Sequence, residues 1–226
     1  MQNYHSLITE IANKIAEWLS NQGYYRVIES EITSFQENFF SLNMDSNHPA
    51  AEPWQSLVFN HSSLLRTHNT GISFRELASS PNKNFAFFSY GKVFRNDAED
   101  QTHTHQFNQL DLIATGDFAA GNLIATIRAL LTHVFDKDME IRFRPSYFPF
   151  TQPSFEVDIF FNDQWIEVLG CGILHPKVMQ NAGFTDYKIR ALAAGIGLER
   201  IAMIKYQIND IREFYKNDLR FLKQFN

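Results

Sequence analysis

The stretch that decides the fold is residues 85–114, FAFFSYGKVFRNDAEDQTHTHQFNQLDLIA. Two runs rich in β-branched and aromatic residues, 85–94 and 106–114, flank the polar segment 95–105. This pattern predicts two antiparallel strands joined by a long loop. Hairpin loops usually have about two to five residues, so a loop of about ten residues favours a function over a mere connection.

One face of the second strand suits a small ligand. Strand periodicity puts Phe107, Gln109 and Asp111 on the same face, which lines up an aromatic ring, an amide and a carboxylate. Arg95, where the first strand meets the loop, is placed to bind a phosphate through its planar guanidinium. An ordinary hairpin with one polar face also explains the segment, and on this stretch alone we favour that interpretation.

A second stretch changes the interpretation. Residues 193–200, AAGIGLER, run into a helical pattern, and glycines before a helix let backbone and ligand approach closely. Together with FRND at 94–97, the GxGxER pattern resembles the signature pair of class II aminoacyl-tRNA synthetases. Three further segments resemble the catalytic core of bacterial phenylalanyl-tRNA synthetase alpha subunits: RPSYFPFTQPSFEVD (144–158), WIEVLGCGILHPKV (165–178) and NDLRFLKQF (217–225). The resemblance covers residues 4–225.

Bulk properties fit an ordinary globular chain. A length of 226 residues suits one α/β unit with room for a core. The net charge of −5 gives no independent support for nucleic-acid binding. The single Cys171 excludes an internal disulfide and fits a reducing compartment. The sequence has no apolar run of about 18 residues and no signal-peptide pattern, so we expect a cytoplasmic protein without a membrane span.

The N-terminal region is predicted to form a helix and a strand. Residues 4–21 carry one apolar stripe that ends at Gly23, and residues 24–32 follow as a strand. By resemblance, residues 4–32 correspond to motif 1, through which class II enzymes dimerise. Ser30 stands where the family has proline, which puts the usual dimer geometry in doubt, so we expect either a homodimer or a beta-like partner subunit.

The remaining pattern predicts one α+β domain over residues 1–226. A helix from 118 to 135, capped by Asp117, is followed by strands at 139–144, 155–161 and 165–169. The resemblance implies the class II synthetase core, a mostly antiparallel sheet flanked by helices, with motif 2 at 85–114 and motif 3 at 193–206. The family's HPAR segment has become His48-Pro49-Ala50-Ala51.

The resemblance implies a site for ATP. Arg95 would hold the α-phosphate, and Arg200 would cover the adenine face opposite Phe107 in a cation–π sandwich. Asp97, in the FRND segment, and His103, toward the outer phosphates, are assigned to the same ATP site.

The sequence offers candidate ligands for two metals, zinc and magnesium. His103-x-His105 has a spacing that can chelate zinc, but one cysteine and no third nearby ligand argue against it. Glu167 is a carboxylate inside an apolar strand, where it needs a cation or hydrogen bonds. The resemblance implies that Glu167 faces ATP and its Mg²⁺, which prefers oxygen ligands.

The resemblance also implies an amino-acid site. Its residues would be His68, Thr70, Gln109, Asp111, Phe148, Phe150, Cys171, Ala193 and Ala194. Three of these positions depart from the family, which has Ser at Thr70, Glu at Asp111 and Phe at Ala194, and so does the neighbouring Leu112, where the family has Gly. These changes predict an aromatic or large apolar amino acid, either bulkier than phenylalanine or with an altered amino end.

Three functions follow. The first is activation of phenylalanine or a similar amino acid by ATP and Mg²⁺, as the catalytic core of a phenylalanyl-tRNA synthetase that serves tRNA alone or with another chain. The second is a short, free-standing paralogue, without the family's N-terminal coiled-coil arm, that passes the activated amino acid to a small molecule, peptide or carrier. The third is a non-catalytic regulatory or binding module. The sequence argues against it, because it keeps the residues that the resemblance assigns to ATP: Arg95, Phe107, Glu167 and Arg200. The sequence alone does not separate the first two.

Overall fold

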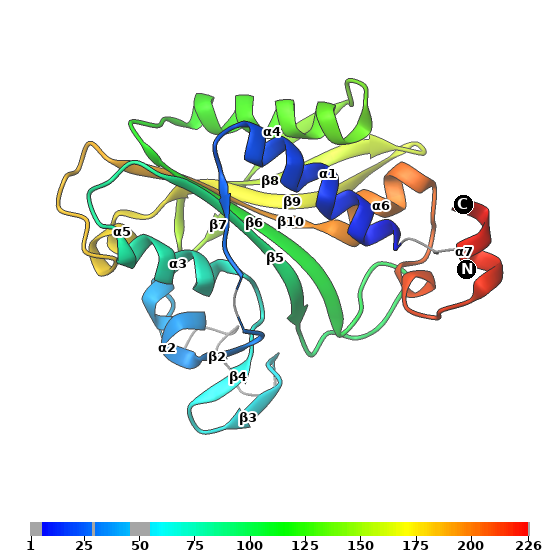
Figure 1. Ribbon diagram of the computed structural model, residues 1–226, viewed down its shortest axis with the longest axis horizontal. Helices are drawn as coiled ribbons and strands as arrows, with labels where there is room; N and C mark the ends of the chain where they lie inside the picture. The colour runs from blue at the N-terminus through cyan, green and yellow to red at the C-terminus, as the bar shows by residue number, and fades with distance from the viewer. Residues whose placement is uncertain (1–5, 29, 46–54, 226) are drawn as a thin grey trace.

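A seven-stranded sheet forms the centre of the protein (Figure 1). The computed structural model describes residues 6–28, 30–45 and 55–225. Every neighbouring pair in the sheet is antiparallel except β1 and β5, which confirms the mostly antiparallel α+β prediction. The strands in spatial order are β1 (Tyr25–Arg26), β5 (Ala86–Phe94), β6 (Gln106–Gly116), β10 (Arg190–Gly197), β9 (Gln164–Leu174), β8 (Thr151–Phe161) and β7 (Ile141–Phe148).

Three helices cover one face of this sheet and build the larger core: α1 (Leu7–Asn21), α4 (Ala120–Phe135) and α6 (Leu198–Tyr206). Leu110, Leu112 and Ala194 point into this core from the strands. Because successive strand residues point to opposite faces, the residues between them face the other side. That other side carries α3 (Thr70–Ser79), α5 (Pro176–Asn181), α2 (Phe35–Asn38) and η1 (Phe40–Leu42) over a second apolar cluster.

The first helix follows its predicted apolar stripe. Within the described residues it begins at Leu7, where Ser6 caps it, and it ends at Asn21. Gly23, just after the end, has a left-handed conformation with φ of 87°.

The predicted cap of α4 is wrong, because β6 continues to Gly116 and the helix begins only at Ala120. The N–H of Ala119 donates instead to Asn122 Oδ1 at 2.9 Å.

The predicted strand 24–32 is wrong as one element. Only β1 joins the large sheet, where Val27 N–H makes the last bond, to Phe88 O at 2.8 Å. The chain then crosses to a small sheet of β2 (Ile32–Ser34), β4 (Ser63–Leu65) and β3 (Val58–Asn60). Its register is set by partners distant in sequence, which strand periodicity does not reveal. The predicted HPAR-like segment 48–51 lies outside the described residues.

The hairpin predicted over residues 85–114 is confirmed. β5 and β6 pair from Phe94↔Gln106 inward, and residues 95–105 form the connecting loop. The predicted turn between β8 and β9 is also found, with positive φ at Asn162 and Asp163, as a tight hairpin turn requires.

The last elements along the chain are η4 (Ile211–Phe214), α7 (Leu219–Leu222) and η5 (Lys223–Phe225). Within the described ranges, no helix has both the length and the apolar character to cross a membrane.

Candidate active site

A cavity of about 870 Å³ lies on the sheet face that α1 and α4 leave free. Strands β6, β9 and β10 form its floor, and loop 95–105, the start of α3 and the β7–β8 turn form its walls. The structure brings together on its lining every residue that the sequence analysis assigned to a site: Arg95, Asp97, His103, Phe107, Glu167, Arg200, His68, Thr70, Gln109, Asp111, Phe148, Phe150, Cys171, Ala193 and Ala194. Their individual roles stay predictions.

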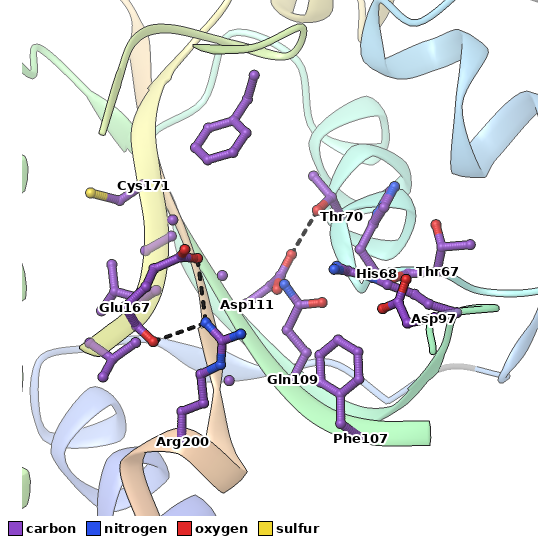
Figure 2. A pocket seen from close by; sticks show the side chains of 18 of the residues that line it. Thr67, His68, Thr70, Asp97, Phe107, Gln109, Asp111, Glu167, Cys171 and Arg200 are labelled. Atoms are coloured by element: carbon purple, nitrogen blue, oxygen red, sulfur yellow. Dashed lines mark hydrogen bonds and ion pairs between the residues drawn. The ribbon is translucent and has the colours of Figure 1, made fainter. Parts of the chain in front are cut away.

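One half of the cavity is a buried polar patch (Figure 2). The hydroxyl of Thr70, at the start of α3, donates to Asp111 Oδ2 at 2.9 Å. The second oxygen of Asp111 is buried and has no hydrogen-bond partner among the described residues. Burial raises the pKa of Asp111 to about 7, although the Thr70 hydroxyl and the charges of Arg66 and Arg95 oppose that shift. Asp111 is therefore placed to bind a cationic group or to accept a hydrogen bond from a ligand.

Two neighbours of Asp111 also carry unsatisfied atoms. Neither ring nitrogen of His68 has a partner of normal hydrogen-bond geometry in the part of the chain that the structure describes, and the same holds for Gln109 Oε1. Burial, and then the charge of Arg95, lowers the pKa of His68 to about 3, so its ring is neutral. A buried polar group left unpaired costs about 1–3 kcal/mol. A polar ligand would remove this cost.

Gly195, the first glycine of the GxG pattern, lies too close to the side chains of Gln109 and Asp111 to carry a side chain of its own. A Cβ on Gly195 would lie 2.5 Å from Gln109 Nε2 and 3.1 Å from Asp111 Oδ1. Any side chain would therefore displace the two polar groups. This glycine opens the floor below them.

The apolar wall of this half comes from the β7–β8 turn. The rings of Phe148 and Phe150 stack with centroids 5.8 Å apart and planes 12° apart. Phe150 also lies 6.2 Å from the His68 ring. Ala193 faces the same side from β10 and leaves space between the rings and the sheet. A flat or bulky apolar side chain suits this space.

Cys171 and Ala194 lie on the cavity wall, but their side chains belong to the core under α4. Figure 2 shows the Cys171 sulfur pointing away from Asp111 and Thr70. Ala194 pairs directly with both Leu112 and Cys171 across the sheet. Positions 194 and 112, where the resemblance implied Phe and Gly, therefore meet in the core. Burial raises the pKa of Cys171 to about 12, which agrees with a small buried apolar residue.

The other half of the cavity carries two guanidinium groups, Arg95 and Arg200, among several carboxylates, and it is more open. Arg200, from the first turn of α6, donates through Nη1 to Glu167 O at 3.0 Å and lies 3.7 Å from Glu167 Oε1 (Figure 2). Its Nη2 is 3.5 Å from His103 Nε2. Arg95 Nε donates to Thr67 O at 3.0 Å, and its guanidinium carbon lies 5.0 Å from the centre of the Phe107 ring.

The donor set on the cavity fits one kind of metal. Among the described residues, no three His, Cys, Asp or Glu side chains gather into a group that could hold an ion by themselves. Glu167 is 45% exposed toward this half of the cavity. Mg²⁺ is usually held by about one or two carboxylates together with substrate phosphates. Glu167 fits that arrangement.

Two buried residues of the site were missed by the sequence analysis. Asn69 is fully buried and donates through Nδ2 to Gln109 O at 2.6 Å, which ties α3 to β6. Glu199 is buried beside Arg200 and accepts from Asn108. The sequence held a signal for each, because Asn69 lies between two assigned residues and Glu199 is the acidic residue of the GxGxER pattern.

Comparison with known proteins gives the family. Residues 2–225 match the family described as tRNA synthetases class II core domain (F). The alpha subunit of phenylalanine–tRNA ligase from Phytoplasma australiense is 43% identical over 96% of this chain and 65% of its own length. The corresponding subunit from Mycoplasma pneumoniae is 41% identical over 98% of this chain and 68% of its own.

A solved structure shows the same fold. The crystal structure of pyrrolysyl-tRNA synthetase from Desulfitobacterium hafniense superposes with a TM-score of 0.72 at 19% identity, covering 93% of this chain and 74% of that one. The chain spans about two thirds of the length of the curated relatives it matches. Because the family match spans residues 2–225, the chain belongs to the family of class II tRNA synthetase core domains, with phenylalanine–tRNA ligase alpha subunits among its relatives.

Proposed function

We propose that this chain activates phenylalanine, or a similar aromatic or large apolar amino acid, with ATP to form an aminoacyl-adenylate and pyrophosphate. One observation carries the proposal: a single cavity joins a buried polar patch with aromatic walls to a half that holds two arginines and Glu167 beside Phe107. The first half suits an amino acid, and the second half suits a nucleotide. The names of the relatives support tRNA as the final acceptor.

In this reaction an oxygen of the amino-acid carboxylate attacks the α-phosphorus, and pyrophosphate leaves. The protein supplies no nucleophile and no base. Reactions at phosphorus depend mainly on positioning and on stabilising charge in the transition state. Arg95 is suited to this task, because its Nε is fixed on Thr67 O and its planar guanidinium lies on the cavity lining, where it would face the α-phosphate.

The amino group would bind at the buried polar patch. An ammonium can donate to Asp111 Oδ1 and Gln109 Oε1, the two oxygens that lack partners among the described residues. Thr70 holds the other Asp111 oxygen and fixes the carboxylate. The incoming positive charge would lower the pKa of Asp111, so that the carboxylate is ionised when the amino acid is bound. Phe148, Phe150 and Ala193 would enclose the side chain.

The nucleotide would bind in the open half. Adenine would lie on Phe107 with Arg200 on its other face, as a guanidinium packs on aromatic rings. His103 and Asp97, both on the cavity lining, would lie near the phosphates. Glu167 would hold Mg²⁺, which neutralises phosphate charge when it is bound.

A partner chain is part of the proposal. Three apolar side chains on the small sheet and the segment leading to it are strongly exposed: Ile28 at 77%, Ile32 at 51% and Phe59 at 60%. They lie in or beside the region that resembles motif 1. Exposed apolar groups of this kind are typical of subunit contacts. We propose that a second copy or a beta-like subunit binds there.

The net charge of −5 favours testing a second acceptor beside tRNA. A tRNA-binding surface usually needs several cationic contacts to phosphates. In this second candidate function the same adenylate would pass to a small molecule, a peptide or a carrier. The activation step and its site would be unchanged.

A pyrophosphate-exchange screen tests the activation step. Phenylalanine, tyrosine, tryptophan, leucine and β-phenylalanine would be compared in the presence of ATP and Mg²⁺, followed by tRNA charging with the best substrate. We expect exchange with at least one aromatic amino acid. Absence of exchange with all of them, together with absence of ATP binding, would refute the proposal. Exchange without tRNA charging would favour the second acceptor class.

A further inference from the structure

A buried carboxylate beside the nucleotide half has no part in the reaction described above. Glu199, in the first turn of α6, is 1% exposed and lies on the cavity wall. Its Oε1 accepts from the backbone N–H and the side-chain amide of Asn108, each at 2.8 Å, and from the Tyr215 hydroxyl at 2.5 Å. Three donors on one buried carboxyl oxygen make a fixed connection, because a hydrogen bond inside the protein is electrostatically stronger than one in water.

This connection lies between the two residues that would enclose adenine. Phe107 precedes Asn108 on β6, and Arg200 follows Glu199 on α6. The ladder between β6 and β10 ends at the pair Gln109↔Gly197, where β10 turns into α6. The Glu199 side chain takes up the next N–H of β6 at the point where the ladder stops. It therefore sets the spacing between strand and helix where Phe107 and Arg200 lie.

The third donor comes from residues 210–225, which we call the C-terminal clasp. The clasp also holds the motif 2 loop, because Ile211 N–H donates to Gln101 O at 2.9 Å. Edge-to-face ring contacts anchor the clasp on the end of α6, with centroid distances of 6.2 Å for Phe214–Phe221, 5.2 Å for Phe221–Phe225 and 5.7 Å for Phe225–Tyr206. The clasp thus leaves α6, touches the loop and Glu199, and returns to α6.

We infer that the C-terminal clasp, acting through Tyr215 and Glu199, is a positioning element that holds Phe107 and Arg200 at the spacing that an adenine ring requires. Tyr215 and Glu199 act through their neighbours and need no contact with the nucleotide. The inference rests on the proposed ATP site. It also gives a role to the C-terminal stretch 217–225, which the proposed reaction leaves without one.

The test compares two variants that each remove one tyrosine hydroxyl. Tyr215→Phe deletes the donor to Glu199. Tyr25→Phe is the matched control, since the Tyr25 hydroxyl donates to Glu76 Oε1 at the same distance of 2.5 Å and Tyr25 is not on the cavity lining. ATP affinity is measured by calorimetry, and KM for ATP and for phenylalanine by pyrophosphate exchange. Thermal unfolding confirms that both variants fold.

We expect Tyr215→Phe to weaken ATP binding and raise KM for ATP by about 2- to 12-fold, the loss expected for one hydrogen bond. KM for phenylalanine should stay unchanged, and Tyr25→Phe should change neither constant. Glu199→Gln, which keeps an acceptor for Asn108 N–H, should lose less ATP affinity than Glu199→Ala. A Tyr215→Phe variant that matches Tyr25→Phe, or that raises both KM values equally, would overturn the inference. A wild-type chain that binds no ATP would instead refute the proposed function itself.

Discussion

The two halves of the cavity satisfy their polar groups in different ways. In the amino-acid half, His68, Gln109 and Asp111 carry buried atoms without partners among the described residues. In the nucleotide half, the side chains of Arg200 and Glu167 are 27% and 45% exposed and contact each other. His103 is equally open, at 47%. One half lacks partners that a ligand would supply, and the other half has partners that a ligand must replace.

This difference predicts different consequences for substitutions in each half. A buried, unpaired group gains its full hydrogen bond when a ligand arrives, so its loss should appear as weaker binding of the ground state. The partly exposed guanidinium of Arg200 exchanges one partner for another on binding. Its loss should therefore appear mainly where new charge develops, in the transition state.

Arg200→Ala should give the largest effect and tests the nucleotide half. We expect kcat/KM for pyrophosphate exchange to fall by about 30- to 1,000-fold, the equivalent of about 2–4 kcal/mol of transition-state stabilisation. Arg128→Ala, on α4 on the other face of the sheet, is the control and should leave exchange unchanged. A decrease of less than about twofold in Arg200→Ala would show that the Arg200 guanidinium takes no part in the reaction.

Asp111→Asn comes next and tests the amino-acid half. The change keeps the shape but removes the charge that faces the ammonium, so phenylalanine should bind about 12- to 160-fold more weakly, while ATP affinity stays near that of the wild type. Calorimetric titration at pH 8 measures both. The control ligand is 3-phenylpropionate, which lacks the amino group and should not lose affinity. Equal losses for both ligands would contradict the assigned role.

Local patterns predicted one part of the molecule well. The hairpin 85–114 and the strand-to-helix turn at 193–200 were found from periodicity and glycine spacing, because contacts between neighbours in sequence determine both. The strand 24–32 failed because its two pieces pair with strands of two different sheets.

The candidate site shows the same limit. Residue types revealed which side chains line the cavity, but not the face on which Ala194 and Cys171 pack, because a strand residue has a buried face on either side of this sheet. Asn69 and Glu199 went unnoticed because their partners, Gln109 O and Asn108, are distant in sequence. Buried polar residues gain their meaning from such partners.

Ala194→Phe tests where the amino-acid half of the cavity ends, and it should have a smaller effect than Asp111→Asn. Because Ala194 packs against Leu112 and Cys171 in the core, the added ring should lower the free energy of unfolding by about 1–3 kcal/mol. Leu112→Gly in the same chain should relieve part of this cost, which urea unfolding of the single and double variants would measure. A stable Ala194→Phe variant with altered amino-acid preference would show that the side chain at 194 points into the cavity.

The pH dependence of stability should give the smallest effect. The pKa of Asp111 is raised from 3.8 to about 7 in the folded chain, so its contribution to the free energy of unfolding falls as pH rises across that window. His68, with a pKa lowered from 6.5 to about 3, acts in the opposite direction, because stability is lost as pH falls below 6.5. The two groups offset each other in the wild type.

Asp111→Asn separates the two groups. The free energy of unfolding of the variant minus that of the wild type should grow from about pH 4 to about pH 7 and then level off. Urea unfolding at a series of pH values measures this difference. A difference that does not change with pH would mean that Asp111 is solvated in the folded chain and that the amino-acid half is not dry.

The most direct test asks whether the two halves work on one pair of substrates. Excess chain would be mixed with ATP, Mg²⁺ and phenylalanine without tRNA, quenched within one turnover and analysed for the adenylate by mass spectrometry. The cavity geometry predicts phenylalanyl-adenylate and pyrophosphate in equal amounts, formed only when the amino acid is present. Binding of both ATP and phenylalanine without any adenylate would contradict the claim that the cavity brings the carboxylate to the α-phosphate.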